Sequence, residues 1–136
     1  MGLLDTSVLI ETPTLDSPGL PAQVAVSAIT FAELAAGPHA TPDPEERARR
    51  QDLLQRAATS LDAIPFDTDA ARAYGLVYAA VTARGRKARG RRAVDLLIAA
   101  TALAAGLPLY TRNPDDFEGL DHLIEVVSLG GAAPEA

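Results

Sequence analysis

Short apolar segments alternate with helix-forming segments through most of this chain, and this alternation limits the fold more than any other feature. Parallel strands need long crossover connections, which are usually helices, so the pattern predicts an α/β fold. We expect three layers, α/β/α, with a small parallel sheet of about 4–5 strands flanked by helices. The expected strands are 2–5, 24–29, 64–66, 107–111 and 123–129, and the expected helices follow residue 7 and then lie at 30–36, 44–60, 68–83 and 93–105.

The length and composition fit one compact domain. The chain has 136 residues, of which 48% are hydrophobic, enough for a core but too few for two ordinary domains. Aromatic residues make up only 4%, so the core must be built largely from Leu, Val, Ile and Ala. We therefore predict a single domain over residues 1–129. The last seven residues, GGAAPEA at 130–136, are expected to form a disordered tail.

Several site chemistries and locations are excluded or disfavoured by composition. The chain has no cysteine, which removes disulfides, thiolate metal sites and thiol catalysis. His39 and His122 do not form a ligand-like pair, which argues against a closed zinc site. Any bound metal should then be a hard cation held by oxygen. The first residues lack a basic leader, and no apolar run reaches transmembrane length, so we expect a cytoplasmic protein without a membrane partner.

Three acidic residues occur where a carboxylate is costly. Asp5 follows a buried strand, Glu33 lies in the apolar stretch FAELAA, and Asp95 opens the most hydrophobic helix. Each has a structural alternative: Asp5 as a helix cap, Glu33 in a capping box with Thr30, and Asp95 at free N–H groups of its helix start. All three are nevertheless expected at strand ends or the following helix starts. In a parallel sheet those positions converge on the ligand crevice.

Four segments, taken together and in order, resemble a known family. They are LLDTSVLI, SAITFAELAAG, VDLLIAATALAAGLPLYTRN and the PDDF that follows. The pattern is similar to PIN-domain ribonucleases, in particular the VapC-type toxins of bacterial toxin–antitoxin pairs. The matching segments lie toward both ends of the chain, while residues 38–92 are less informative about the family. The resemblance implies a PIN-like fold and a divalent-metal site, for Mg²⁺ or Mn²⁺, whose core acids are Asp5, Glu33 and Asp95.

The sequence departs from this family at the fourth acid. The first position to align, 18 residues after Asp95, is Asn113, and Asp116 follows three residues later. Either could complete the metal site, Asn113 through its amide oxygen or Asp116 through its charge. Four neighbouring residues could support the site by orienting acids, holding water or contacting phosphate: Thr6, Ser7, Thr111 and Arg112. Helix capping is the alternative for Thr6 and Ser7, and an ion pair with Asp115 or Asp116 is the alternative for Arg112.

The resemblance also implies an activity and partners. Phosphodiester hydrolysis needs stabilisation of the negative charge on the phosphate and an activated water molecule. A Mg²⁺ ion held by carboxylates can supply both. Without a cation, clustered carboxylates repel one another, which is itself a reason for metal affinity. The implied function is that of an endoribonuclease toxin in a type II toxin–antitoxin system. Its implied partners are an RNA substrate, a cognate antitoxin that docks in the active-site groove, and a second copy in a homodimer.

Positive charge is concentrated in one segment although the formal net charge is −6. Six of the twelve Lys and Arg residues fall between Arg84 and Arg92. A solvated loop is the plain interpretation of such a run. Beside an acidic site it could instead admit a polyanion, so its members are candidate RNA contacts. These candidates are Arg86, Lys87, Arg89, Arg91 and Arg92; the three tyrosines, Tyr74, Tyr78 and Tyr110, are assigned to core or dimer packing.

Three other functions compete with this one, and each requires particular residues. A haloacid-type phosphatase needs a second Asp where the chain has Ser7. A receiver-like α/β module that accepts phosphate needs a Lys after a late strand, but the only lysine is Lys87. A catalytically inactive PIN-like interaction protein is the strongest alternative, because Asn113 stands at the first position to align with the family's fourth acid.

Overall fold

A parallel five-stranded sheet forms the centre of the protein. The computed structural model describes residues 1–11, 18–86 and 90–129, and its strand order is β3-β2-β1-β4-β5, with every neighbouring pair parallel. This confirms the predicted α/β class. The expected tail at 130–136 lies outside the described residues. The strands are β1 (Gly2–Leu4), β2 (Val24–Ser27), β3 (Asp62–Ile64), β4 (Leu109–Thr111) and β5 (Val126–Ser128).

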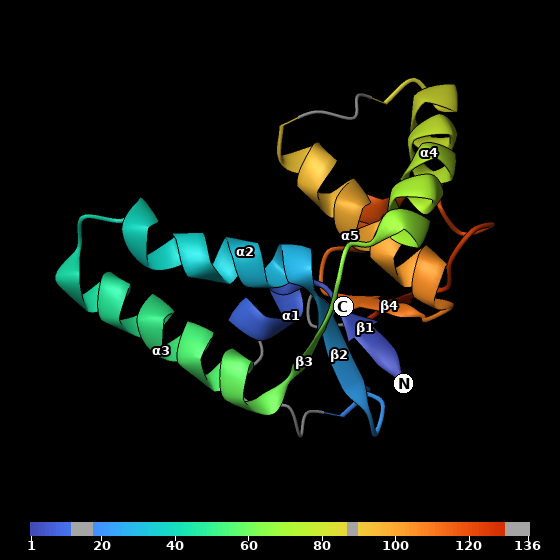
Figure 1. Ribbon diagram of the computed structural model, residues 1–136. Helices are drawn as coiled ribbons and strands as arrows, with labels where there is room; N and C mark the ends of the chain where they lie inside the picture. Colours follow the sequence, from blue (N-terminus) through green and yellow to red (C-terminus); the bar gives the residue numbers. More distant parts are fainter. Residues whose placement is uncertain (12–17, 87–89, 130–136) are drawn as a thin grey trace, which may run out of the picture.

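Helices cover both faces of this sheet. Figure 1 shows α4 and α5 together on one side of the strands, and α2 with α3 on the other. Two 3₁₀ helices, η1 and η2, follow α2 and β4. No helix within the described ranges combines the length and hydropathy needed to cross a bilayer. The bounds are α1 (Thr6–Glu11), α2 (Ala28–Ala36), η1 (Gly37–Ala40), α3 (Pro44–Ser60), α4 (Thr68–Ala83), α5 (Arg91–Ala105) and η2 (Pro114–Phe117).

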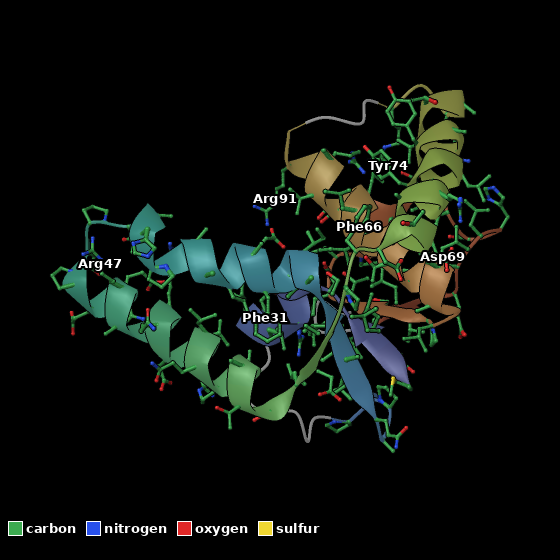
Figure 2. The ribbon with its side chains drawn as sticks, in the orientation of Figure 1. Phe31, Arg47, Phe66, Asp69, Tyr74 and Arg91 are labelled. Carbon is green, nitrogen blue, oxygen red and sulfur yellow. The ribbon has the colours of Figure 1, made fainter. Side chains whose placement is uncertain are left out.

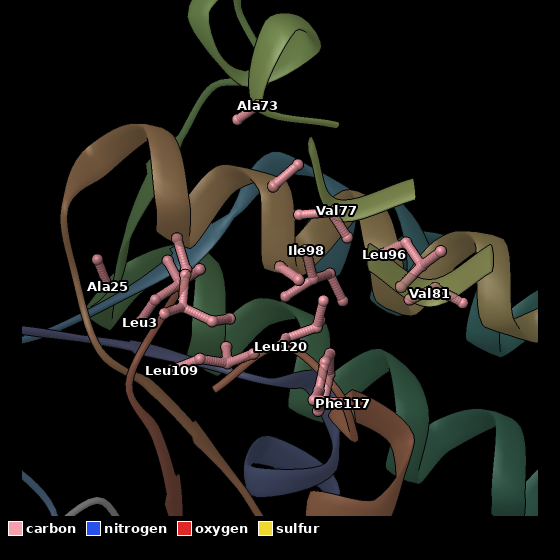
Figure 3. Close-up of a cluster of buried hydrophobic side chains, with 14 residues drawn as sticks. Leu3, Ala25, Ala73, Val77, Val81, Leu96, Ile98, Leu109, Phe117 and Leu120 are labelled. Atoms are coloured by element: carbon pink, nitrogen blue, oxygen red, sulfur yellow. The ribbon is translucent and has the colours of Figure 1, made fainter. Parts of the chain in front are cut away.

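The sheet has a hydrophobic core on each face, because successive strand residues point in opposite directions. Leu3 packs into the core beneath α4 and α5, which Figure 3 shows, while the next residue, Leu4, packs into the core beneath α1, α2 and α3. Ala25 and Val26 of β2 divide in the same way. Replacing either buried leucine with Ala should lower the free energy of unfolding by about 2–5 kcal/mol. Because β1 and β2 are packed on both faces, the core fixes the positions of their C-terminal ends.

Local capping explains the helix boundaries, including one that differs from expectation. Asp43 and Asp67 cap α3 and α4 through bonds from Glu46 N and Ala70 N, as predicted. The capping box on Thr30 was wrong: Ser27 caps α2 by accepting from Thr30 N at 3.0 Å, so strand β2 ends two residues earlier than the predicted 24–29.

The boundaries of four further elements shift. β3 pairs through Asp62–Ile64 rather than 64–66, because Pro65 has no N–H to continue the ladder. β4 and β5 are also shorter than their apolar runs suggest. Helix α5 begins at Arg91, two residues before the predicted start, and ends at Gly106 in the left-handed region. Two arginines assigned to the basic segment thus belong to a helix.

Candidate active site

The C-terminal ends of β1 and β4 form the edge at which the predicted acids gather. These two strands are adjacent in the sheet, and Asp5 N continues their ladder by donating to Tyr110 O at 2.8 Å. Asp5 therefore leaves the sheet beside the turn that carries Asn113 and Asp116. Glu33 reaches this region from α2 and Asp95 from α5. The crevice position predicted for Asp5 follows directly from strand order.

Asp5 is buried and held by two hydroxyl groups. Ser7 Oγ donates to Asp5 Oδ2 at 2.8 Å, and Thr111 Oγ1 donates to the same oxygen at 2.9 Å. Each hydroxyl is fixed in turn by a backbone donor: Arg112 N bonds Ser7 Oγ at 3.1 Å, and Asn113 N bonds Thr111 Oγ1 at 2.9 Å. These bonds orient the carboxylate before anything binds. The four residues predicted to support the site thus include two that contact Asp5 directly.

Glu33 is held by a different hydroxyl group. Thr6 Oγ1 donates to Glu33 Oε1 at 2.5 Å and also lies 3.1 Å from Thr30 Oγ1. Thr6 and Ser7 are the first two residues of α1, and their side chains bond acids and hydroxyls of the site. The capping alternative for this pair is therefore wrong. So is the capping-box alternative for Glu33, which sits in the second turn of α2.

Asp95 carries the strongest electrostatic signal in the site. It is the fifth residue of α5, beyond the first turn, so the prediction that it opens the helix was wrong. Its pKa is raised from 3.8 to about 7, first by burial and then by the charges of Asp116, Asp5 and Glu33, against the opposing effect of Arg91. Like charges raise the pKa of a carboxyl group only when they are near it. The four predicted acids therefore share one electrostatic environment.

The fourth acid and the amide take different positions. After burial, Asp116 is the largest influence on the pKa of Asp95, which places its charge close to the site. Asn113 is exposed, and its backbone N–H serves the Thr111 hydroxyl. The charge of Asp116 thus acts on Asp95, whereas Asn113, which is neutral, could contribute only its amide oxygen.

The donor set fits a hard divalent cation by its chemistry. Among residues 1–11, 18–86 and 90–129, no three acidic or histidine side chains are already drawn together around one point. The carboxylates instead lie near enough to raise the pKa of Asp95, while hydroxyls hold two of them. Oxygen donors with uncompensated repulsion are what Mg²⁺ and Mn²⁺ select.

A groove of about 780 Å³ has Glu33 in its lining. Thr6 and Arg91 also line it, together with residues of α3 that include Arg49, Arg56 and Ser60. Figure 2 shows Arg91 at the start of α5, on the side toward α2. The groove is therefore lined by both a candidate metal ligand and several arginines.

The basic segment divides into different roles. Arg86 donates to Glu118 Oε1 at 2.8 Å, and Arg84 lies 3.7 Å from the other oxygen of Glu118. Arg92 Nη1 donates to Asp116 O at 2.9 Å. Three of these arginines thus tie the turn that carries Asp116 to α5 and the end of α4. Lys87 and Arg89 lie outside the described residues.

The tyrosines lie mainly in packing contacts. Tyr74 packs against the core beneath α4 and α5, and its ring centroid is 6.1 Å from that of Tyr78. Tyr110 packs against the opposite core. Tyr78 is 46% exposed and Leu76 is 59% exposed, and the two side chains flank the buried Val77 on different sides of α4.

Sequence reasoning missed two residues behind Glu33. Ser27 and Thr30 are fully buried, and their hydroxyls lie 3.4 Å apart behind Thr6. Their signal was present as a three-residue spacing from Ser27 through Thr30 to Glu33. Assigning Thr30 to a capping box concealed it.

Comparisons with known proteins concern the whole chain and its fold. The PIN domain matches residues 2–123. The chain is 38% identical over 123 residues to ribonuclease VapC5 of Mycobacterium tuberculosis, covering 88% of this chain and 87% of that protein. It is 40% identical over 101 residues to the VapC ribonuclease Y4jK of Sinorhizobium fredii, covering 71% and 70%. Among solved structures, VapBC-5 of Mycobacterium tuberculosis, a member of the VapBC family of toxin–antitoxin systems, matches with a TM-score of 0.81 and 36% identity over 94% of this chain and 98% of that one.

Proposed function

The chain belongs to the PIN-domain family and resembles its VapC ribonucleases, and on this premise we propose that it is the toxin of a type II toxin–antitoxin pair. Its proposed activity is Mg²⁺- or Mn²⁺-dependent endoribonucleolytic cleavage. The observation that carries this proposal is the half-buried Asp95, whose pKa is raised to about 7 by burial and by Asp116, Asp5 and Glu33. Catalytic carboxylates with such perturbed pKa values mark functional sites.

The proposed metal ligands are Asp5, Glu33, Asp95 and Asp116, with the Asn113 amide as the alternative to Asp116. When bound, a divalent ion supplies positive charge to phosphate oxygens and lowers the pKa of water. The protein's own contribution is orientation. Ser7 and Thr111 hold Asp5 in place, and Thr6 holds Glu33, so these side chains need little reorganisation when the ion enters.

RNA is the proposed substrate, and Arg91 is its strongest candidate contact. The chain carries a formal net charge of −6, so a polyanion needs local positive charge to approach the acids. Arg91 provides such charge in the groove that Glu33 also lines. Arg86 and Arg92 are already bonded to Glu118 and the Asp116 carbonyl, which makes them weaker candidates.

Two protein partners are proposed with this function. The solved relative VapBC-5 is a member of a toxin–antitoxin family, which supports a cognate antitoxin for this chain, docked in the groove. A homodimer is the second partner proposed, on the resemblance to the VapC-type toxins, and Leu76 and Tyr78 are exposed apolar side chains of α4 that it could cover. Light scattering after size exclusion tests the dimer, and a monomer at tens of micromolar would contradict it.

Titration calorimetry with Mn²⁺ on the metal-free protein tests the proposed site. We expect binding by the wild type, and loss of at least tenfold in affinity for Asp5→Asn and Asp95→Asn. Asp69→Asn is the matched control, because Asp69 is an exposed acid on α4 paired with Arg72. Equal affinity in all four proteins, or no binding by the wild type, would refute the metal site and favour an inactive PIN-like interaction protein.

Cleavage and toxicity are tested with the same variants. The purified wild type should cleave RNA with added Mn²⁺ and stop when EDTA is added. Induced expression should arrest growth, and Asp95→Asn should relieve the arrest while Asp69→Asn should not. Equal arrest by wild type and Asp95→Asn would contradict a nuclease mechanism through these acids.

A further inference from the structure

A line of three hydroxyl groups runs from the end of β2 to the carboxylate of Glu33. Ser27 Oγ lies 3.4 Å from Thr30 Oγ1, which lies 3.1 Å from Thr6 Oγ1, and Thr6 Oγ1 lies 2.5 Å from Glu33 Oε1. Ser27 and Thr30 are completely buried, and Thr6 is nearly so. Buried hydroxyls at this density are costly unless each one is bonded. Their arrangement therefore requires a definite pattern of donors.

That pattern is set by Thr6. A carboxylate only accepts, so Thr6 is the donor to Glu33 Oε1. Thr6 Oγ1 also lies in donating geometry to Thr30 Oγ1, and Ser27 Oγ donates to Thr30 Oγ1. The Ser27 oxygen accepts from Thr30 N at 3.0 Å, which closes the far end. The Thr6 hydroxyl is thus held between Glu33 and Thr30, and the Thr30 hydroxyl is held in turn by Ser27.

We propose that Thr30 and Ser27 are positioning residues for Glu33, acting through Thr6 to hold its carboxylate in the orientation that receives the metal ion. This inference rests on the proposed function of the site. It assigns a role to two residues that touch neither the acids nor the groove. Without the Thr30 hydroxyl, Thr6 Oγ1 loses one of the two groups that fix its position, and Glu33 gains rotational freedom.

A purely structural role is the competing explanation, since Ser27 also caps α2. Thr30 separates the two explanations because its side chain can change while its backbone N–H still reaches Ser27. Thr30→Val keeps the branched shape and removes the hydroxyl, and Thr30→Ser keeps the hydroxyl. Thr101→Val is the matched control. Thr101 is equally buried, and its hydroxyl bonds Leu97 O at 2.9 Å on α5, away from this line of hydroxyls.

Two measurements test the proposal, both without RNA cleavage. The first is Mn²⁺ affinity by calorimetry, which we expect to fall about tenfold in Thr30→Val and to recover in Thr30→Ser. The second is the ¹³Cδ resonance of Glu33 in the metal-free protein, assigned by its loss in Glu33→Gln. It should move in Thr30→Val and stay in place in Thr101→Val, although both variants lower the melting temperature. Thr30→Ala replaces Thr30→Val should the latter not fold.

The outcomes separate this inference from the function on which it rests. If the wild type and Thr30→Val bind Mn²⁺ equally and the Glu33 resonance is unchanged, the positioning role is refuted while the metal site stands. If Thr101→Val weakens Mn²⁺ binding as much as Thr30→Val, the effect is general destabilisation and the proposal is overturned. If the wild type binds no Mn²⁺, the proposed function fails, and the positioning of Glu33 for a metal fails with it.

Discussion

Thr111 and Asp5 are 106 residues apart in the chain, yet Thr111 Oγ1 donates a hydrogen bond of 2.9 Å to Asp5 Oδ2. The two residues end β4 and follow β1, which pair through Leu3 with Leu109 and Leu4 with Tyr110. The bond therefore joins the ends of adjacent central strands. It also makes the orientation of a candidate metal ligand depend on correct register between them.

Replacing Thr111 with Val should weaken both the fold and the site. Thr111 is fully buried, and the change removes a donor to Asp5 and the acceptor of Asn113 N. Leaving buried partners unsatisfied costs about 1–3 kcal/mol of unfolding free energy, measurable by urea denaturation. Thr111→Ser keeps the hydroxyl and should recover most of this loss. A Thr111→Val variant as stable as the wild type, with Thr111→Ser destabilised, would mean that the methyl group, and not the hydroxyl, stabilises this position.

Asp95 should make the metal-free protein less stable as the pH rises. Its folded pKa of about 7 lies above its ordinary value of 3.8, so the folded state holds the proton more tightly than the unfolded state. The resulting stabilisation is complete below about pH 4 and is lost as the pH rises through 7. The full difference would correspond to about 4 kcal/mol. Water reaches part of this side chain and screens the repulsion, so we expect about 2 kcal/mol.

The measurement is the difference in unfolding free energy between wild type and Asp95→Asn, in EDTA, from pH 4 to 8. Asn is neutral throughout, so the difference isolates Asp95 from other titrating groups. Relative to Asp95→Asn, the wild type should lose stability between these pH values. A constant difference would show that the pKa of Asp95 is close to its ordinary value.

The parts of the fold that sequence predicted well are those with strong local signals. Helices α3 and α4 have aspartate caps followed by regular helical periodicity, and both were placed within a residue. The start of α5 was misplaced because its first turn carries Arg91 and Arg92 and resembles a charged loop. Charge does not prevent a helix from forming when the next turns are apolar and buried against a sheet.

The sequence singles out the candidate acids but not the hydroxyl groups beside them, for a physical reason. Asp5, Glu33 and Asp95 stand out as carboxylates among apolar neighbours, and family motifs contain them. The hydroxyls of Ser27 and Thr30 have no such contrast, because serine and threonine near a helix start usually cap it. Their second role depends on α1 packing beside α2, a tertiary contact that local patterns do not contain. The tether from Arg92 to Asp116 was missed for the same reason.

Replacing Arg92 tests whether its side chain holds the turn that carries Asp116 or contacts RNA. Arg92→Gln removes the bond to Asp116 O, so the turn should loosen and the unfolding free energy should fall by about 1 kcal/mol. In a cleavage assay, kcat should fall severalfold while KM for RNA stays nearly constant. Arg72→Gln, which changes an exposed arginine of α4, should alter neither constant. A rise in KM with unchanged kcat would instead show that Arg92 contacts RNA.

Arg91 should give the opposite kinetic result, because it lines the groove beside Glu33. A contact with RNA phosphate releases bound counterions, and each such contact contributes about 0.7 to the slope of log affinity against log salt for a single strand. Arg91→Gln should raise KM and lower that slope by about this amount. Binding is best measured with Ca²⁺ in place of Mn²⁺, to prevent cleavage, and Arg72→Gln again serves as the control. Should the slope and KM stay at their wild-type values in Arg91→Gln, the approach of RNA past α5 would be wrong, and the positive charge that admits the substrate would have to come from the α3 side of the groove.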